Sequence, residues 1–174
     1  LVPPLAYEAT DITRDAFTAN WSTVSGASGY RLDVSSQNDF SSFVSGYNNL
    51  DVGGADSWDV SGLASGVTYY YRVRAYNVTN ISPNSNTIAV QTDLRAPTAR
   101  SAYAVTSTGF YANWQVITGA TGYRLDVASD NEFLSLVSGY VDLDVGMTSF
   151  KPVNGLSAGS TYYYRVRAYS ASHL

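Results

Sequence analysis

Residues 62–76 read GLASGVTYYYRVRAY, and residues 155–169 read GLSAGSTYYYRVRAY. The second half of each stretch alternates as a β-strand requires, because successive side chains point to opposite faces of a sheet. In the first copy, the face that is apolar enough for a core consists of Tyr69, Tyr71, Val73 and Ala75. The opposite face carries the charges and consists of Tyr70, Arg72, Arg74 and Tyr76. The stretch therefore predicts a β-strand with one buried face.

The repeat extends well beyond this stretch. Trp21 recurs as Trp114 and Tyr30 as Tyr123, in each case 93 positions later. We therefore expect two tandem domains, at residues 1–93 and 94–174. Position 174 aligns with position 81, so we expect the second domain to lack a counterpart of the alternating run at residues 87–92. The first residue is leucine rather than methionine, which suggests a piece of a longer protein or a processed product.

Three motifs of each repeat resemble one known family. The pattern Leu-x-x-Gly-x-x-Tyr at residues 63–69 is typical of a tyrosine corner, in which the tyrosine hydroxyl bonds back to upstream backbone. Residues 17–21 alternate with Trp21 inward, and residues 30–34 form a second alternating run. Together they resemble strands B, C and F of fibronectin type III domains. The resemblance implies an all-β fold of two tandem immunoglobulin-like sandwiches, the second lacking its own strand G.

Alternation and turn residues locate the strands of the first repeat. We predict them at Ala6–Thr10, Ala16–Ser22, Gly29–Ser35, Phe43–Tyr47, Ser57–Ser61, Thr68–Asn77 and Asn86–Thr92. The predicted core contains Trp21, Tyr30, Leu32, Leu63, Tyr69, Tyr71 and Val73, with Trp114, Tyr123, Leu125, Leu156, Tyr162, Tyr164 and Val166 in the second repeat. In that repeat Pro152 falls within a strand. Proline is tolerated at edges and bulges, and one extra residue between Phe150 and Gly155 predicts a bulge there.

Composition narrows the possible partners. The formal net charge is −4, so nucleic acid is not expected as a partner. The chain has no cysteine, which excludes disulfides and thiolate metal sites. No apolar run approaches the roughly 20 residues that a membrane span requires.

Catalytic chemistry is not predicted, and neither is a cofactor or a metal. The single histidine is His173, and no base lies near the serine-rich loops to form a nucleophile–base pair. Asp39, Asp130 and Glu132 lie in loops and could ligate calcium, but Asx-type turns are the favoured interpretation. Asp51 and Asp144 are likewise interpreted as turn residues.

The charged face of the central strands is the candidate interaction surface. Exposed tyrosine and arginine dominate binding hot spots, and flat tyrosines stack on sugars. The residues that we nominate are Arg31, Tyr70, Arg72, Tyr76, Arg124, Tyr163, Arg165 and Tyr169. The competing interpretation, which we favour, is internal pairing: Asp33 would bind Arg72 or Arg74, and guanidinium groups would lie on tyrosine rings.

Three Asn-x-Ser/Thr triplets are possible glycosylation sites, at Asn20, Asn77 and Asn80. Asn20 recurs as Asn113 without the serine or threonine, so it is interpreted as a structural residue of its strand. Asn77 and Asn80 lie in a predicted exposed loop and are the better candidates.

The resemblance implies a function class. Near-identical tandem repeats of this type are similar to those of bacterial secreted or cell-surface proteins. We therefore expect a non-catalytic extracellular structural or adhesion module that contacts neighbouring domains or identical subunits. One alternative is the repeating protomer of an extracellular fibre, glycosylated and assembled by strand or end-to-end contacts. Another is a carbohydrate-binding accessory module of a secreted enzyme, with glycans as partners.

Overall fold

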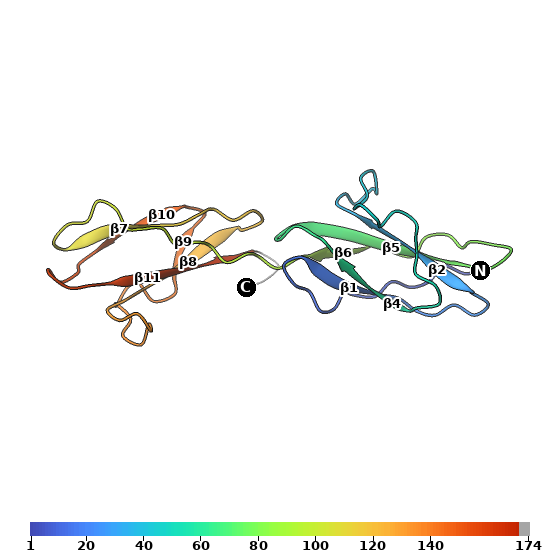
Figure 1. The fold of residues 1–174 in the computed structure, drawn as a ribbon, viewed down its shortest axis with the longest axis horizontal. Coiled ribbons are helices and arrows are strands. Elements are labelled where there is room, and N and C mark those ends of the chain that lie inside the picture. The colour runs from blue at the N-terminus through green and yellow to red at the C-terminus, as the bar shows by residue number, and fades with distance from the viewer. Residues whose placement is uncertain (171–174) are drawn as a thin grey trace. The chain divides into compact units, whose positions relative to one another are not determined.

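The computed structural model describes residues 1–170, which form eleven β-strands and no helix (Figure 1). Among these residues there is accordingly no helical segment that could cross a membrane. The chain divides into two compact units, unit 1 at Leu1–Asp93 and unit 2 at Leu94–Leu174. Unit 1 contains β1 (Ala16–Asn20), β2 (Gly29–Ser35), β3 (Leu50–Asp51), β4 (Ser57–Ser61), β5 (Thr68–Tyr76) and β6 (Ile88–Gln91). Unit 2 contains β7 (Gly109–Asn113), β8 (Gly122–Ala128), β9 (Leu143–Gly146), β10 (Phe150–Asn154) and β11 (Tyr163–Tyr169).

Unit 1 is a sandwich of two antiparallel sheets. One sheet pairs β1 with β4, and the other has the order β3-β2-β5-β6. The side chains of β5 alternate strictly between buried and half-buried, as its sequence predicts. The second sheet therefore presents one face to the core and the other, with its arginines, to solvent.

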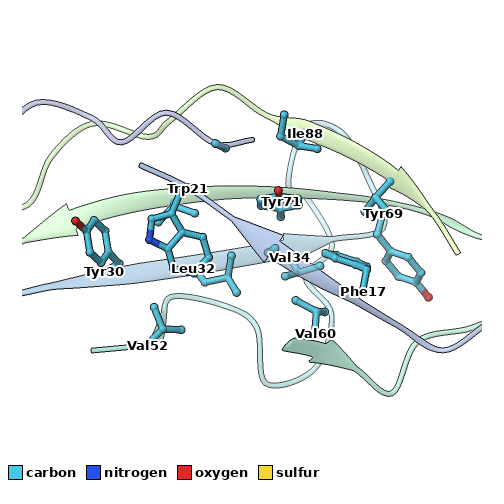
Figure 2. Packing of buried hydrophobic residues seen from close by; sticks show 14 of the residues in the cluster. Phe17, Trp21, Tyr30, Leu32, Val34, Val52, Val60, Tyr69, Tyr71 and Ile88 are labelled. Carbon is cyan, nitrogen blue, oxygen red and sulfur yellow. The ribbon is translucent and has the colours of Figure 1, made fainter. Parts of the chain in front are cut away.

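The core of unit 1 lies between the two sheets, and Figure 2 shows its labelled side chains packed between the ribbons. Phe17 from β1 stacks on Tyr71 from β5, with ring centroids 5.8 Å apart. Trp21 lies against Tyr30 at 6.0 Å. Every core residue predicted for this repeat is buried. Ile88 and Val90 of β6 close the side of the core next to β5.

Unit 2 repeats this plan with fewer strands. The sheets are β7-β10 and β9-β8-β11. Trp114, Tyr123 and Leu125 are buried like their counterparts. Tyr162 and Tyr164 are only partly buried, which corrects the prediction that they are core residues. The reason is that, within residues 1–170, no strand pairs with the edge of β11 that corresponds to the β6 side of β5.

Tyrosine hydroxyl groups fasten the loops to the sheets in both units. The hydroxyl of Tyr69 accepts a hydrogen bond from the backbone N–H of Ala64 at 2.9 Å, which confirms the predicted tyrosine corner. The hydroxyl of Tyr71 donates to the carbonyl of Tyr7 and accepts from the N–H of Asn20 at 3.2 Å. Burial raises the pKa of Tyr71, so this hydroxyl keeps its proton.

Three local predictions are wrong. Residues 6–10 form only isolated bridges at their two ends, because the pairing of Ala6 with Trp21 and that of Thr10 with Thr18 are not in one register. No strand forms at residues 43–47, where a bridge at Phe43 and backbone bonds of Val44 and Tyr47 to Val34 are the contacts with β2; the strand that pairs with this side of β2 is β3. There is no bulge at Pro152, because β10 and β7 pair in continuous register. Phe150 occupies the place of Ser57, not of Trp58, so no extra residue exists.

Candidate functional site: the arginine and tyrosine face

The solvent-side face of β2 and β5 gathers the nominated residues of unit 1. We call it the arginine–tyrosine face; it consists of Arg31, Asp33, Tyr70, Arg72, Arg74 and Tyr76, and in unit 2 of Arg124, Asp126, Tyr163, Arg165, Arg167 and Tyr169. The strand register sets Asp33 opposite Arg72, and Arg31 opposite Arg74. Like charges directly opposite each other are destabilising. The carboxylates of Asp51 and Asp33 offset this repulsion, because Asp51 pairs with Arg31 and Asp33 pairs with Arg74.

The carboxylate of Asp33 is the centre of the face in unit 1. It accepts hydrogen bonds from Arg72 Nε at 3.0 Å and from an Arg74 terminal nitrogen at 3.2 Å. Its other oxygen accepts the backbone N–H of Asn49 at 2.7 Å. Asp33 is only 1% exposed, and its bonds to Arg72 and Arg74 confirm the favoured internal pairing. A buried carboxylate of this kind requires paired charges, and the two arginines provide them.

Unit 2 builds the same centre with one substitution. Asp126 accepts Arg165 Nε at 2.9 Å and the backbone N–H of Asp142 at 2.6 Å. Asp142 replaces Asn49, and its side chain binds Arg167 at 2.7 Å. Burial alone would raise the pKa of Asp126, but the hydrogen bonds from Asp142 and Arg165 outweigh it and lower that pKa. The carboxylate therefore stays ionised.

A second cluster lies beside each centre and joins β2, β3 and β5. The Tyr76 hydroxyl donates to Asp51 at 2.9 Å, and Arg31 binds the same carboxylate at 3.2 Å. The Arg31 guanidinium also lies over the Tyr76 ring, 4.9 Å from its centroid. The ring crosses Gly29, where a Cβ would come within 2.5 Å of the phenol oxygen, so a larger residue there would displace the Tyr76 ring. Asp51 thus bonds across the sheet as well as in the predicted turn.

The same arrangement recurs in unit 2. The Tyr169 hydroxyl donates to Asp144 at 3.0 Å, and Arg124 lies 5.5 Å from the centroid of the Tyr169 ring. The backbone N–H of Gly146 and then the Tyr169 hydroxyl lower the pKa of Asp144. The hydrogen bond to Asp144 raises the pKa of Tyr169. The Asp144 carboxylate therefore stays ionised and the Tyr169 hydroxyl keeps its proton, as the hydrogen bond between them requires.

A loop phenylalanine supports each centre and was missed from the sequence. The guanidinium of Arg72 lies 3.9 Å from the centroid of the Phe40 ring, and that of Arg165 lies 4.5 Å from the Phe133 ring. Both phenylalanines have positive φ, 58° and 60°, which is unusual for a bulky residue and signals a backbone held by its surroundings. The recurrence of Ser-x-x-x-Phe before each loop turn was the available signal.

Two of the nominated tyrosines have hydroxyl groups without a hydrogen-bond partner in the described part of the chain. Tyr70 is half-buried and Tyr163 is 41% exposed, and neither hydroxyl bonds to a described residue. They lie apart from the charge centres, toward the start of β5 and β11. The face thus offers one free phenol per unit, while its arginines and other tyrosines are occupied by partners within the same unit.

The acidic loop residues act as turn formers. Asp39 accepts the backbone N–H of Ser41 at 3.0 Å, and Asp130 accepts that of Glu132 at 3.0 Å, which confirms the Asx-type interpretation. Hydrogen bonds from the Ser41 side chain and backbone lower the pKa of Asp39. Residues 1–170 contain no group of three or more acidic or histidine side chains placed to hold a metal ion. His173 lies outside the described residues.

The three sequon asparagines differ in how their amides are used. The Asn20 amide nitrogen donates to the carbonyls of Glu8 and Thr18, at 3.2 and 3.1 Å. The Asn77 amide nitrogen donates to the carbonyl of Gly26 at 3.0 Å. The Asn80 side chain is exposed, and among residues 1–170 its amide nitrogen donates only to the neighbouring Thr79 hydroxyl, at 3.3 Å. Among the three, Asn80 therefore has the most open amide.

The two-sheet architecture and the tyrosine corner define an immunoglobulin-like β-sandwich. The model of the Fibronectin type III domain matches residues 2–91, so the chain belongs to that family. A two-domain fibronectin type III segment of chicken tenascin superposes with a TM-score of 0.58 over 97% of this chain and 91% of that one. At 17% identity, this likeness concerns the fold.

A sequence relative matches about half of the chain. The Kelch domain-containing protein SSO1033 of Saccharolobus solfataricus is 33% identical over 90 residues, or 51% of this chain. The matched region spans only 12% of that protein's length. Fibronectin type III domains are commonly structural or adhesion modules and are typically non-catalytic. The family therefore fixes the fold and only a broad class of function.

Proposed function

We propose that this chain is a non-catalytic structural or adhesion module, a spacer repeat of a larger bacterial protein that is secreted or held at the cell surface. One observation carries the proposal: most polar groups of the arginine–tyrosine face are bound within their own unit, and the arrangement is the same in both units. A face evolved to dock a ligand leaves hydrogen-bonding groups free for it. Here six of the eight nominated residues have partners, namely Arg31, Arg72, Tyr76, Arg124, Arg165 and Tyr169.

The paired face suits a load-bearing repeat. Each carboxylate centre ties β2 to β5, or β8 to β11, through side chains in addition to the backbone ladder. The clusters at Asp51 and Asp144 extend the ties to β3 and β9. Cross-strand side-chain pairs of this type stiffen a sheet. Partners of such a module are neighbouring domains or identical subunits, and Asn80 is the proposed glycan attachment site.

A polysaccharide-binding assay tests the proposal against a carbohydrate-binding accessory module. The intact chain is titrated with a panel of soluble polysaccharides while intrinsic fluorescence is recorded. We expect no saturable change. The matched variant replaces both open phenols, Tyr70→Ala and Tyr163→Ala. Saturable binding that this double variant abolishes would contradict the structural role and favour carbohydrate recognition.

The extracellular location needs a separate measurement. Protease added to intact cells of the source organism should cleave the parent protein if this module is displayed outside. Protection of the module in intact cells, with cleavage only after lysis, would refute that part of the proposal.

A further inference from the structure

The outer side of the β7–β10 sheet in unit 2 carries a row of three aromatic rings. The ring centroids of Tyr103 and Tyr111 lie 5.1 Å apart, and those of Tyr111 and Phe150 lie 6.1 Å apart. Because Ala112 is fully buried, Tyr111 beside it faces away from the core. Pro152 pairs with Tyr111 across the sheet and shares this outer side. Tyr103 and Phe150 are each 47% exposed, so solvent reaches both ends of the row.

An exposed arginine borders the row. Ala99 bridges to the core residue Trp114, so Arg100 next to it lies on the outer side of the sheet. Its backbone N–H donates to the carbonyl of Asn113 at 3.0 Å, and Asn113 pairs with Phe150. Within residues 1–170 the Arg100 guanidinium forms no ion pair, so it is available to a partner. We call this surface the aromatic sheet face; it consists of Arg100, Tyr103, Tyr111, Phe150 and Pro152.

The corresponding surface of unit 1 is largely polar. The β1–β4 sheet has the same register as β7–β10, so each position has a counterpart 93 residues earlier. Those counterparts are Tyr7, Thr10, Thr18, Ser57 and Asp59, which we call the β1–β4 face. On that face the Thr18 hydroxyl donates to the exposed carboxylate of Asp59 at 2.7 Å. The same sheet therefore forms without the aromatic row, and the row is not needed for the fold.

The two units also differ in charge. Unit 1 has nine acidic and four basic side chains, a formal charge of −5, whereas unit 2 has five acidic and six basic ones, a formal charge of +1. The acidic residues of unit 2 all lie outside β7, β10 and the segment before β7. In or beside the matching part of unit 1 the exposed acidic residues are Glu8, Asp11, Asp15, Asp56 and Asp59. The aromatic sheet face thus carries a positive charge where the β1–β4 face is negative.

The two faces complement each other chemically. Aromatic residues and arginine are enriched in the centres of protein interfaces, and exposed apolar patches mark interaction sites. The β1–β4 face offers the Asp59 carboxylate for an ion pair with Arg100. It also offers the exposed ring of Tyr7, on which an aromatic ring or a guanidinium can stack. Opposite charges on two apposed surfaces select the matching partner and speed its approach.

We propose that the aromatic sheet face of unit 2 docks on the β1–β4 face of unit 1 in a second copy of this chain. The contact joins two different surfaces, so successive copies extend into a row or close into a ring. This inference rests on the proposed function, because it specifies how identical subunits meet.

Sedimentation velocity of the intact chain, from micromolar to millimolar concentration, tests the association. We expect the weight-average mass to rise with concentration. Added salt should lower that mass, because salt screens the attraction between exposed charges. A chain that stays monomeric over the whole range would overturn the proposal.

Two variants test the aromatic half of the contact. Phe150→Ser installs the residue that unit 1 has at Ser57, so the fold should be kept while association weakens by about tenfold or more. Leu134→Ser is the matched control, because Leu134 is 80% exposed in a loop outside the face and its counterpart is Ser41. The control should associate like the parent chain. Equal association of the two variants would overturn the assignment of the face.

The acidic half is tested by reversing one charge. Asp59→Lys should weaken association by about tenfold or more, whereas Glu132→Lys, the same change at an exposed loop residue of unit 2, should have little effect. If Asp59→Lys associates like the parent while Phe150→Ser does not, two aromatic sheet faces meet each other, and our choice of occupant is overturned.

Mixing the two defective variants tests whether the faces belong together. The Phe150→Ser copy keeps its β1–β4 face, and the Asp59→Lys copy keeps its aromatic sheet face. We expect the equimolar mixture to form one-to-one dimers under conditions in which each variant alone is monomeric. A mixture that stays monomeric would overturn the pairing.

A glycan is the other occupant to be tested, with the same panel of polysaccharides. Saturable binding to the parent chain that Phe150→Ser abolishes would make a polysaccharide the occupant of the aromatic sheet face and overturn our choice of a second copy. The structural role has its own test, since that role is contradicted by polysaccharide binding that Tyr70→Ala with Tyr163→Ala abolishes. A monomeric chain would therefore overturn the interface alone.

Discussion

The substitution Asp33→Ala tests the carboxylate centre of unit 1. It removes a side chain that is 1% exposed and that binds Arg72, Arg74 and the N–H of Asn49. Breaking a buried ion pair by removing one partner costs about 3–5 kcal/mol, because the remaining charge is left uncompensated. The arginines are 24% and 25% exposed, so water recovers part of this cost. We expect a loss of about 3 kcal/mol from the free energy of unfolding of unit 1.

Urea unfolding followed by two-dimensional NMR resolves the two units, because each contributes its own amide signals. A loss of about 3 kcal/mol should lower the urea midpoint of unit 1 by about 1–3 M, for m-values of 1–3 kcal/mol/M. The midpoint of unit 2 should not move. Asp59→Ala, which removes an exposed aspartate of unit 1, is the matched control and should have little effect. A loss below about 1 kcal/mol in the Asp33 variant would place the centre among ordinary surface ion pairs and refute the reasoning.

Three further predictions concern the core and the response to pH. Trp21→Ala should destabilise unit 1 by about 3–5 kcal/mol in the same urea assay, because it empties a large core site; a loss under about 1 kcal/mol would contradict this. Tyr71→Phe should cost about 1–3 kcal/mol, because it removes the hydroxyl that joins the Tyr7 carbonyl to the Asn20 N–H, and an unchanged midpoint would refute that role. The folded pKa of Asp126 is lowered, so its contribution to stability is present above pH of about 4 and is lost as the pH falls further; the folded pKa of Tyr76 is raised by its bond to Asp51, so its contribution is present below pH of about 10 and is lost above it. A thermal unfolding midpoint that rises as the pH falls below about 4, or as it rises above about 10, would contradict these predictions.

The central strands could be predicted from the sequence alone because their pattern is local. Alternation located β2 at Gly29–Ser35 and β4 at Ser57–Ser61 with their observed bounds. The tyrosine corner and the buried face of β5 followed from the same stretch. Each of these features depends on neighbouring residues, so a single sequence contains the information.

The errors arose where distant segments decide the outcome. Alternation placed Asp33 beside Arg72 and Arg74 and predicted their pairing, but the bond from the backbone N–H of Asn49 comes from a loop and was not predicted. No strand forms at residues 43–47, because residues 44–47 make a turn in which the N–H of Tyr47 bonds the carbonyl of Val44; the strand that pairs with β2 there is β3. Pro152 was misread because Phe150 was aligned with Trp58 by residue type, whereas the register matches it to Ser57.

The arginine–tyrosine face was located by sequence, but its state required the structure. The strand pattern identified which arginines and tyrosines share a face. The partners Phe40, Phe133 and Asp142 come from loops, so their contacts with the arginines could not be inferred from spacing.

The most direct test of the paired face is the behaviour of two guanidinium protons in solution. Arg72 Nε and Arg165 Nε donate to buried carboxylates at 3.0 and 2.9 Å, so their N–H signals should be sharp and slow to exchange with water in an NMR spectrum. The Arg72 signal should disappear in Asp33→Ala and the Arg165 signal in Asp126→Ala, each without effect on the other. Rapid exchange of both protons in the unmodified chain, as for free surface arginines, would contradict a face that is bound to itself.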